Sequence, residues 1–131
     1  MPAKPILVVD DSPSIRSMIA ACLRVGGYEV TEASAGDEAH QLACRAQEGA
    51  PFAMLVTDQV MPGMDGLTLI SRLRAEPRYA TIPMLMLTTE SEGQIREKAR
   101  AAGASGFLPK PFDPEQLMQS VDALMSPSSE G

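Results

Sequence analysis

The stretch PILVVDDS at residues 5–12 joins a run of branched apolar residues to two adjacent carboxylates. A continuous run of Ile, Leu and Val is typical of a parallel strand buried on both faces, so residues 5–10 are predicted to form a β-strand. Asp10 and Asp11 stand where this strand ends. Two like charges a few ångströms apart disfavour each other's ionisation, so such a site usually holds a cation or shares a proton. The stretch therefore predicts a positive group at the end of a buried strand.

Short apolar runs alternate with amphipathic stretches along the rest of the chain. The clearest helix begins after Ser12, a natural N-cap, and ends at Gly26 and Gly27, because apolar residues between them recur every three or four positions. This alternation is typical of an α/β domain with a parallel sheet. The strands are predicted at residues 5–10, 28–33, 52–57, 82–88 and 105–109, and further helices at about 37–48, 66–75, 91–103 and 114–125.

The polarity of each predicted strand indicates its place in the sheet. The runs ILVV, FAMLV and MLML are apolar throughout and read as interior strands, whereas YEVTEA alternates and GFLPK is short with a proline, as edge strands can be. This pattern predicts a flavodoxin-like, doubly wound sheet of five parallel strands in the order 2-1-3-4-5, flanked by five helices. In such sheets ligands bind beyond the carboxyl ends of the central strands. Asp10, Asp11, Asp58 and Thr88 should therefore meet in one crevice.

Length and composition limit the kinds of protein that this chain can be. Its 131 residues fit a single domain, with a core at about 5–125 and a flexible tail at 126–131. We expect a cytoplasmic monomer without membrane contact, because the chain lacks both the apolar core of a signal peptide and a run long enough to span a bilayer. A formal charge of -6 argues against nucleic acid as a partner. Cys22 and Cys44 are expected to be buried free thiols.

Each polar residue of the predicted crevice also has an ordinary structural explanation. Asp11 can start a helix, Asp58 can cap a turn, and Asp65 in the turn MDG can be an N-cap. Thr88 can be a common strand residue, and Lys110 can be one more solvated lysine. None of these explanations accounts for their convergence on the same rim of the sheet. The grouping is therefore the functional signal.

The grouping is chemically coherent as a phosphoryl-transfer site. Three carboxylates at one point suit Mg²⁺, which takes oxygen ligands and bridges carboxylates to phosphate oxygens, and no loop supplies the six to eight oxygens that calcium prefers. A carboxylate can also be a nucleophile that forms an aspartyl phosphate, with the metal offsetting the repulsion between charges. Thr88 and Lys110 could contact the remaining phosphoryl oxygens through a hydroxyl and an ammonium group.

Four motifs make the chain resemble the receiver domain of two-component response regulators, with CheY-like single-domain proteins the most similar. They are VVDDS, TDQVMPGMDG, MLTTE and LPKPF, at residues 8–12, 57–66, 86–90 and 108–112, in the order and spacing of that family. The resemblance covers residues 5 to about 125. It implies the following roles: Asp58 as the phosphorylated residue, Asp10 and Asp11 as metal carboxylates, the backbone carbonyl of Val60 as a further ligand, Thr88 and Lys110 as phosphoryl contacts, and a cis Lys110-Pro111 bond.

Two positions depart from the pattern of the family. Phe107 stands where receivers that act on the flagellar switch often carry tyrosine, so the tyrosine hydroxyl is missing. We therefore expect the Phe107 ring to stay mostly buried. Together with Thr88 it would couple the site to the surface by packing alone. Val60 stands where many relatives carry a polar side chain that could orient a hydrolytic water. Glu90 is then the only nearby polar candidate for that task. Val60 and Glu90 are therefore expected to set the phosphorylation lifetime.

The predicted function is that of a stand-alone response regulator, a phosphoacceptor with slow self-dephosphorylation rather than a dedicated enzyme. It would take its phosphoryl group from a histidine kinase and bind a protein target on the face of the fourth helix and fifth strand, in chemotaxis-type signalling. A phosphorelay intermediate or a stress-signalling adaptor is the alternative. A haloacid-dehalogenase-type phosphatase is disfavoured because Asp10 and Asp11 are adjacent. A flavodoxin-type flavin binder is disfavoured because these two charges would repel the flavin phosphate. A degenerate receiver is disfavoured because the phosphorylation residues are present.

Overall fold

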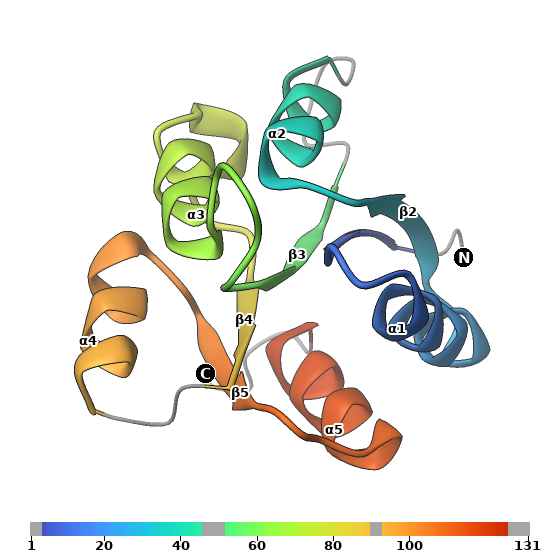
Figure 1. The fold of residues 1–131 in the computed structure, drawn as a ribbon. Helices are drawn as coiled ribbons and strands as arrows, with labels where there is room; N and C mark the ends of the chain where they lie inside the picture. The colour runs from blue at the N-terminus through green and yellow to red at the C-terminus, as the bar shows by residue number, and fades with distance from the viewer. Residues whose placement is uncertain (1–3, 46–51, 90–92, 126–131) are drawn as a thin grey trace.

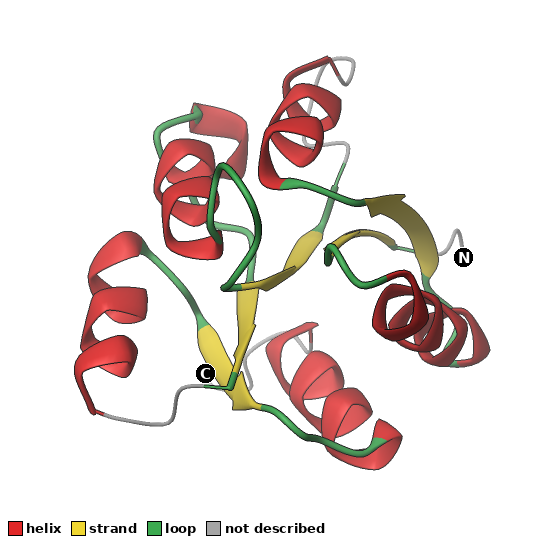
Figure 2. Cartoon of the chain, viewed as in Figure 1, coloured by secondary structure: helices red, strands yellow, loops and turns green. Residues whose placement is uncertain are grey.

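The apolar runs of the sequence form the five strands of one sheet in the computed structural model, which describes residues 4–45, 52–89 and 93–125. Glu90 and the predicted tail at 126–131 lie outside the described residues. Strands and helices alternate along the chain (Figures 1 and 2). The strands are β1 Pro5–Val9, β2 Glu29–Ala33, β3 Met54–Asp58, β4 Met84–Thr88 and β5 Gly106–Pro109. The helices are α1 Pro13–Val25, α2 Gly36–Arg45, α3 Gly66–Arg74, the 3-10 helix η1 Pro77–Tyr79, α4 Gly93–Ala102 and α5 Pro114–Met125.

All pairings in the sheet are parallel, and the strand order is β2-β1-β3-β4-β5. The flavodoxin-like order predicted from strand polarity is therefore confirmed. β3 differs slightly from its prediction at 52–57, because it runs from Met54 to Asp58. Asp58 is consequently the last residue of the strand and is hydrogen-bonded into the sheet, with Leu87 as its partner in register. This register fixes the Asp58 backbone more firmly than a loop position would.

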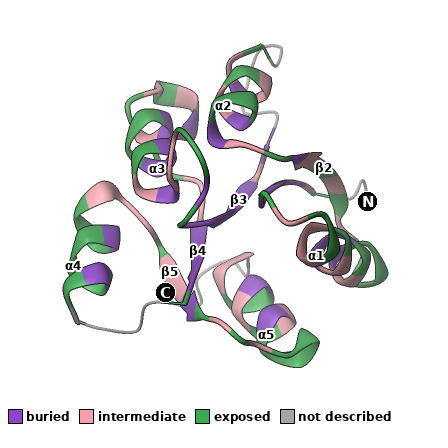
Figure 3. Ribbon diagram, in the orientation of Figure 1, coloured by how far each residue is buried: buried purple, intermediate pink, exposed green. Residues whose placement is uncertain are grey.

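The strands send alternate side chains into two apolar layers. On one face, the side chains of Ile6 and Val8 pack with α1 and α5. On the other face, Leu7 and Val9 pack with α2, α3 and α4. Figure 3 shows the buried residues on the strands and on the sheet-facing sides of the helices. Both faces of the central strands are covered, which is why their sequences are apolar throughout.

Two helices begin at the side-chain caps that the sequence predicts. The Ser12 hydroxyl accepts a hydrogen bond from the Ile15 amide at 3.4 Å. The Asp65 carboxylate accepts one from the Thr68 amide at 2.8 Å, so Asp65 is the N-cap of α3, as its structural explanation proposed. α1 ends at Gly26 and Gly27, and Gly27 adopts a φ of 96°, a left-handed conformation that favours glycine.

Arg74, the last residue of α3, joins three separate segments. Its guanidinium donates to the carbonyl of Gly103 at 2.9 Å, to the carbonyl of Tyr79 at 2.9 Å and to the hydroxyl of Ser105 at 3.2 Å. Gly103 has a φ of 112°, and a Cβ there would come within 2.6 Å of the Arg74 Cγ. The turn after α4 is thereby bound to the end of α3.

The expectation that both cysteines are buried is wrong. Cys22 and Cys44 are free thiols, as predicted, but each is only half-buried. Cys22 lies on α1 beside Met18, and Cys44 lies in the last turn of α2 beside His40. Within the described residues, no helix combines the length and the apolar character that crossing a membrane requires.

Candidate functional site

The carboxyl ends of the parallel strands place the predicted polar residues at one edge of the sheet. Asp58 ends β3 and Thr88 ends β4, whereas Asp10 directly follows β1 and Lys110 directly follows β5. Asp58 and Thr88 are buried. Because β1, β3, β4 and β5 are neighbours in the sheet, residues from four separate segments line the same edge. The convergence predicted from the strand order is confirmed.

Three carboxylates form the acidic part of the site. Asp10, Asp11 and Asp58 each offer one carboxylate oxygen, and these oxygens lie within 4.8 Å of one another. Asp10 is fully buried, Asp58 is 5% exposed and Asp11 is exposed. The Asp10 Oδ1 atom accepts a hydrogen bond from the Ser12 amide at 2.9 Å. This bond holds one oxygen of Asp10 toward the start of α1.

The second oxygen of Asp10 supports a cation at this point. Among the described residues, Asp10 Oδ2 is buried without a hydrogen-bond partner, and the Lys110 ammonium 3.5 Å away lies closer to Asp58, so a further cation would compensate this oxygen. Hard divalent cations bind carboxylate oxygens, and Mg²⁺ typically takes one or two carboxylates together with waters. The carboxylates of Asp10, Asp58 and Asp11, whose oxygens lie close together, provide ligands of this kind. The residues therefore fit Mg²⁺.

Lys110 supplies the positive charge of the site. Its Nζ lies 2.9 Å from Asp58 Oδ1 and 3.5 Å from Asp10 Oδ2. Burial alone would lower the pKa of Lys110, but the hydrogen bond to Asp58 and the charges of Asp10 and Asp58 outweigh this effect and raise the pKa. The side chain is therefore a firmly protonated ammonium group, directed at the two buried carboxylates.

The pKa of the Asp58 carboxyl group is raised by its surroundings. Burial raises the pKa of Asp58 above its usual range, and the hydrogen bond from Lys110 opposes this effect. The negative charges of Asp10 and Asp11 raise the pKa of Asp58 further. Negative charge at this carboxylate is therefore unfavourable unless a cation offsets it.

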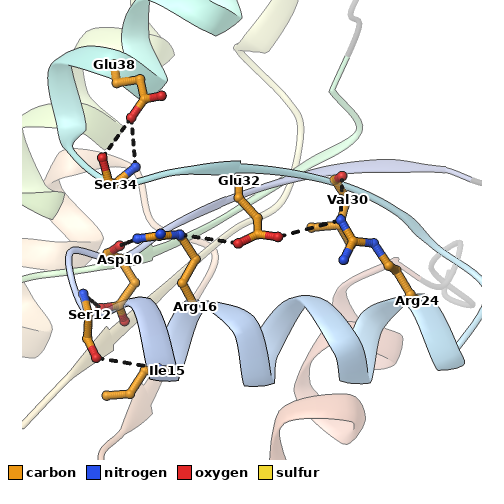
Figure 4. Close-up of polar contacts among 9 residues, drawn as sticks. All are labelled: Asp10, Ser12, Ile15, Arg16, Arg24, Val30, Glu32, Ser34 and Glu38. Carbon is orange, nitrogen blue, oxygen red and sulfur yellow. Dashed lines mark hydrogen bonds and ion pairs between the residues drawn. The ribbon is translucent and has the colours of Figure 1, made fainter.

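Arg16 fixes the end of β1, a role that the sequence did not reveal. Its guanidinium donates to the backbone carbonyl of Asp10 at 2.7 Å and pairs with the Glu32 carboxylate of β2 at 3.3 Å, as Figure 4 shows. Arg24 approaches the other oxygen of Glu32 at 3.6 Å. These contacts hold Asp10 in place through its backbone and leave its carboxylate to the site.

Gln59 fixes the loop after β3, and sequence reasoning also missed this residue. Its backbone N–H donates to Asp58 Oδ1 at 3.0 Å, and its side-chain oxygen accepts from the backbone N–H of Leu67 at 2.9 Å. Gly66 lies so close that a Cβ there would be 2.5 Å from the carbonyl of Asp58. The glycine of the MDG turn was the available signal, because such a close backbone approach admits no side chain.

The remaining predicted residues occupy different positions around the site. Thr88 is fully buried, and its carbonyl accepts a hydrogen bond from the Lys110 amide at 2.7 Å. The Lys110-Pro111 bond is cis, as the resemblance implied. The side chain of Val60 is on the surface, with 62% exposure. Phe107, expected to be mostly buried, is half-buried, and the Arg96 guanidinium lies 5.4 Å from its ring centroid.

Comparisons with known proteins agree with this geometry. The family model described as response regulator receiver domain matches residues 6–122. The chain is 38% identical to a chemotaxis protein CheY homolog of Campylobacter jejuni over 128 residues, which is 96% of each protein. The structure of chemotaxis response regulator CheY4 of Vibrio cholerae superposes with a TM-score of 0.87 at 37% identity, over 94% of this chain and 99% of that one.

A second solved structure bears on the acidic group. The receiver domain of sensor histidine kinase PA1611 of Pseudomonas aeruginosa has a magnesium ion coordinated in its active site cleft. It superposes with a TM-score of 0.82 at 29% identity and covers 93% of this chain and 97% of that one. Other curated relatives are longer transcriptional regulators, of which the chain spans about half the length, 48% and 56% in two cases.

Proposed function

The chain belongs to the response regulator receiver domain family, and on that premise we propose that Asp58 accepts a phosphoryl group from a histidine kinase. The observation that carries the proposal is the position of the Asp58 carboxylate. It lies at the carboxyl end of a central strand, 2.9 Å from the Lys110 ammonium and beside Asp10 and Asp11. A nucleophilic carboxylate therefore has both a fixed cation and a candidate metal position next to it.

Asp10, Asp11 and Asp58 would hold Mg²⁺, together with the backbone carbonyl of Val60. Bound magnesium supplies positive charge that offsets the repulsion between the attacking carboxylate and the phosphoryl oxygens. The grouping of three carboxylates within 4.8 Å is the main support for this assignment, and Asp10 Oδ2 has no hydrogen-bond partner among the described residues. Because Asp10 is anchored by Ser12 and by Arg16, the ligand would be in place before the ion arrives.

In the proposed reaction an Asp58 carboxylate oxygen forms a bond to phosphorus while the phosphorus–nitrogen bond of a phosphohistidine breaks. The electron pair of that bond stays on the imidazole nitrogen. Lys110 would then turn from the Asp58 carboxylate to a phosphoryl oxygen, and the Thr88 hydroxyl would bind another. Later attack by water on phosphorus would return the free carboxylate, so the chain would act as a self-limiting switch and not as a dedicated enzyme.

The output would be binding of a protein target to the face of α4 and β5. A cavity of about 290 Å³ lies on this face and is lined in part by Arg96, Arg100 and Phe107. Its two guanidinium side chains favour an acidic partner surface. The near end-to-end match to a CheY homolog supports chemotaxis-type signalling as the pathway.

The phosphoacceptor assignment can be tested with acetyl phosphate and intact mass measurement. Wild-type protein in Mg²⁺ should gain one phosphoryl group, and Asp58→Asn should gain none. Asp65→Asn is the matched control, because Asp65 lies in the same loop region but caps α3, a role that asparagine also fills. A label on Asp58→Asn, or equal labelling of wild type in excess chelator, would contradict the proposal.

A further inference from the structure

A second group of metal-binding side chains lies on the α2 and α3 side of the molecule. His40 and Cys44 are one helical turn apart on α2, so they share a face of that helix, and Glu76 follows α3. One donor atom from each lies within 4.8 Å of the others. All three side chains are half-buried and therefore reachable by an ion from solvent.

The distance between the sulfur and imidazole ligands matches that in a zinc site. The Cys44 Sγ lies 3.7 Å from the nearer ring nitrogen, Nε2 of His40. In a tetrahedral site with usual zinc–sulfur and zinc–nitrogen bonds, these two atoms lie about 3.6 Å apart. One thiolate, one imidazole and one carboxylate are common zinc ligands, and three protein ligands leave a fourth position for water. Thiolate and imidazole are softer than the all-oxygen set at Asp58, so this group would select a different metal.

The structure already holds the two halves of this group together. The Tyr79 hydroxyl donates to the carbonyl of Ala43 at 2.9 Å, and Arg78 donates to the carbonyl of Cys44 at 2.8 Å. Both bonds join the turn that follows Glu76 to the last turn of α2. Glu76 caps η1 without a side-chain hydrogen bond, so its carboxylate is not engaged in capping. The guanidinium of Arg78 opposes a nearby cation, and the negative charges of the carboxylate and thiolate would offset it.

We propose that His40, Cys44 and Glu76 bind one Zn²⁺ ion, with water as the fourth ligand. Because the helices run antiparallel to the strands, the last turns of α2 and α3 lie at the amino-terminal edge of the sheet, opposite the Asp58 site. Zinc there would bridge α2 to the segment after α3, which lie side by side in Figure 1. The inference is independent of the phosphoacceptor role of Asp58.

Cobalt provides a specific probe, because a thiolate bound to Co²⁺ gives a charge-transfer absorption that oxygen ligands do not give. Reduced wild-type protein in excess Mg²⁺ should develop this absorption with one equivalent of Co²⁺ and lose it when Zn²⁺ displaces the cobalt. Cys44→Ser should not develop it. The matched control is Cys22→Ser, which removes the other half-buried free thiol and should behave as wild type.

The other two ligands are tested by His40→Gln and Glu76→Gln. Loss of an outer-shell partner already weakens metal binding about 10- to 100-fold, so loss of a ligand should weaken it at least about tenfold. Circular dichroism checks that each variant is folded. In a second measurement, Zn²⁺ should slow alkylation of Cys44 and leave that of Cys22 unchanged. Absence of the absorption in wild type, its persistence in Cys44→Ser, or its loss in Cys22→Ser would overturn the proposal.

Discussion

The raised pKa of Asp58 makes its carboxylate a source of instability at neutral pH. When a carboxyl pKa is higher in the folded protein than in the unfolded chain, the folded state binds more protons. The resulting stabilisation is present below the ordinary carboxyl pKa and is lost as the pH rises through the raised value. Without a divalent cation, Asp58→Asn should therefore increase the free energy of unfolding at pH 7.

Urea unfolding in chelator checks this prediction. The stability difference between Asp58→Asn and wild type should shrink as the pH falls toward about 4, where the carboxyl group becomes protonated in both states. Millimolar Mg²⁺ should also reduce the difference, because a ligand that binds only the folded state stabilises it. Asp65→Asn serves as the control for a carboxylate outside the acidic group. An Asp58→Asn protein less stable than wild type at pH 7 would show that Lys110 dominates the balance.

Val60 offers a second test at the scale of one residue. Its apolar side chain cannot orient a hydrolytic water, so phospho-Asp58 should decay more slowly in wild type than in Val60→Asn. The side chain is 62% exposed, so the substitution removes little buried packing. Val25, at 90% exposure on α1, provides the matched control Val25→Asn. Equal decay of wild type and Val60→Asn in excess Mg²⁺ would remove Val60 from the control of the lifetime.

Among the elements, α4 is anchored by fewer buried apolar side chains than α1. It buries Ile95 and Ala99, whereas α1 buries Ile19, Ala20 and Leu23. Less buried apolar area means a lower free-energy cost for local displacement. We therefore expect amide exchange in α4 to change when beryllofluoride, a phosphoryl mimic, is added with Mg²⁺.

Exchange followed by mass spectrometry of peptides gives the readout for α4. Asp58→Asn is the control, because it should abolish the change if the mimic acts through Asp58. Peptides from α2 should be unaffected and serve as an internal reference, because α3 lies between α2 and α4 (Figure 1). A change confined to α1 and α5 would place the output surface on the opposite face of the sheet.

The strand order was predictable because strand polarity reflects how many faces of a strand are covered. The alternation in β2 and the proline in β5 mark edges for this reason. The acidic group was predictable because parallel strands bring their carboxyl ends together. Contacts made by long polar side chains were not predictable: Arg74 reaches a carbonyl 29 residues away, and no local pattern encodes that direction. Glu76 joins His40 and Cys44 only through the packing of two helices, although the four-residue spacing on α2 was visible.

At the scale of the whole molecule, two tyrosines report whether distant segments stay joined. The Tyr28 hydroxyl donates to Asp122 of α5 at 2.7 Å, and that of Tyr79 donates to the carbonyl of Ala43 on α2. Burial and then Asp122 raise the pKa of Tyr28 to about 12, and burial raises the pKa of Tyr79. The folded protein should therefore form little tyrosinate at pH 10, where an unfolded tyrosine is about half ionised.

Ultraviolet titration of native and urea-unfolded protein measures this directly. Tyr28 contributes stability that is present below pH 10 and is lost as the pH rises toward about 12, because its folded pKa is the higher one. The raised pKa of Tyr79 gives a contribution of the same sign, lost as the pH rises through that raised pKa. Asp122→Asn should lower the Tyr28 midpoint without returning it to the unfolded value, because burial is the larger cause. Native tyrosines that titrate with the unfolded midpoint would mean that these junctions are open in solution.

Two of the three bonds of Arg74 hold the carboxyl-terminal end of α4 against the end of α3. The bonds to Gly103 and Ser105 join the carboxyl-terminal end of α4 to the end of α3. The amino-terminal end of α4 faces the edge of the sheet where Asp58 and Thr88 lie. A rearrangement that starts at that edge would rotate α4 about its fixed carboxyl-terminal end. The displacement would be largest beside the site and would fade toward Gly103, so a target that reads the leading turn would receive the strongest signal.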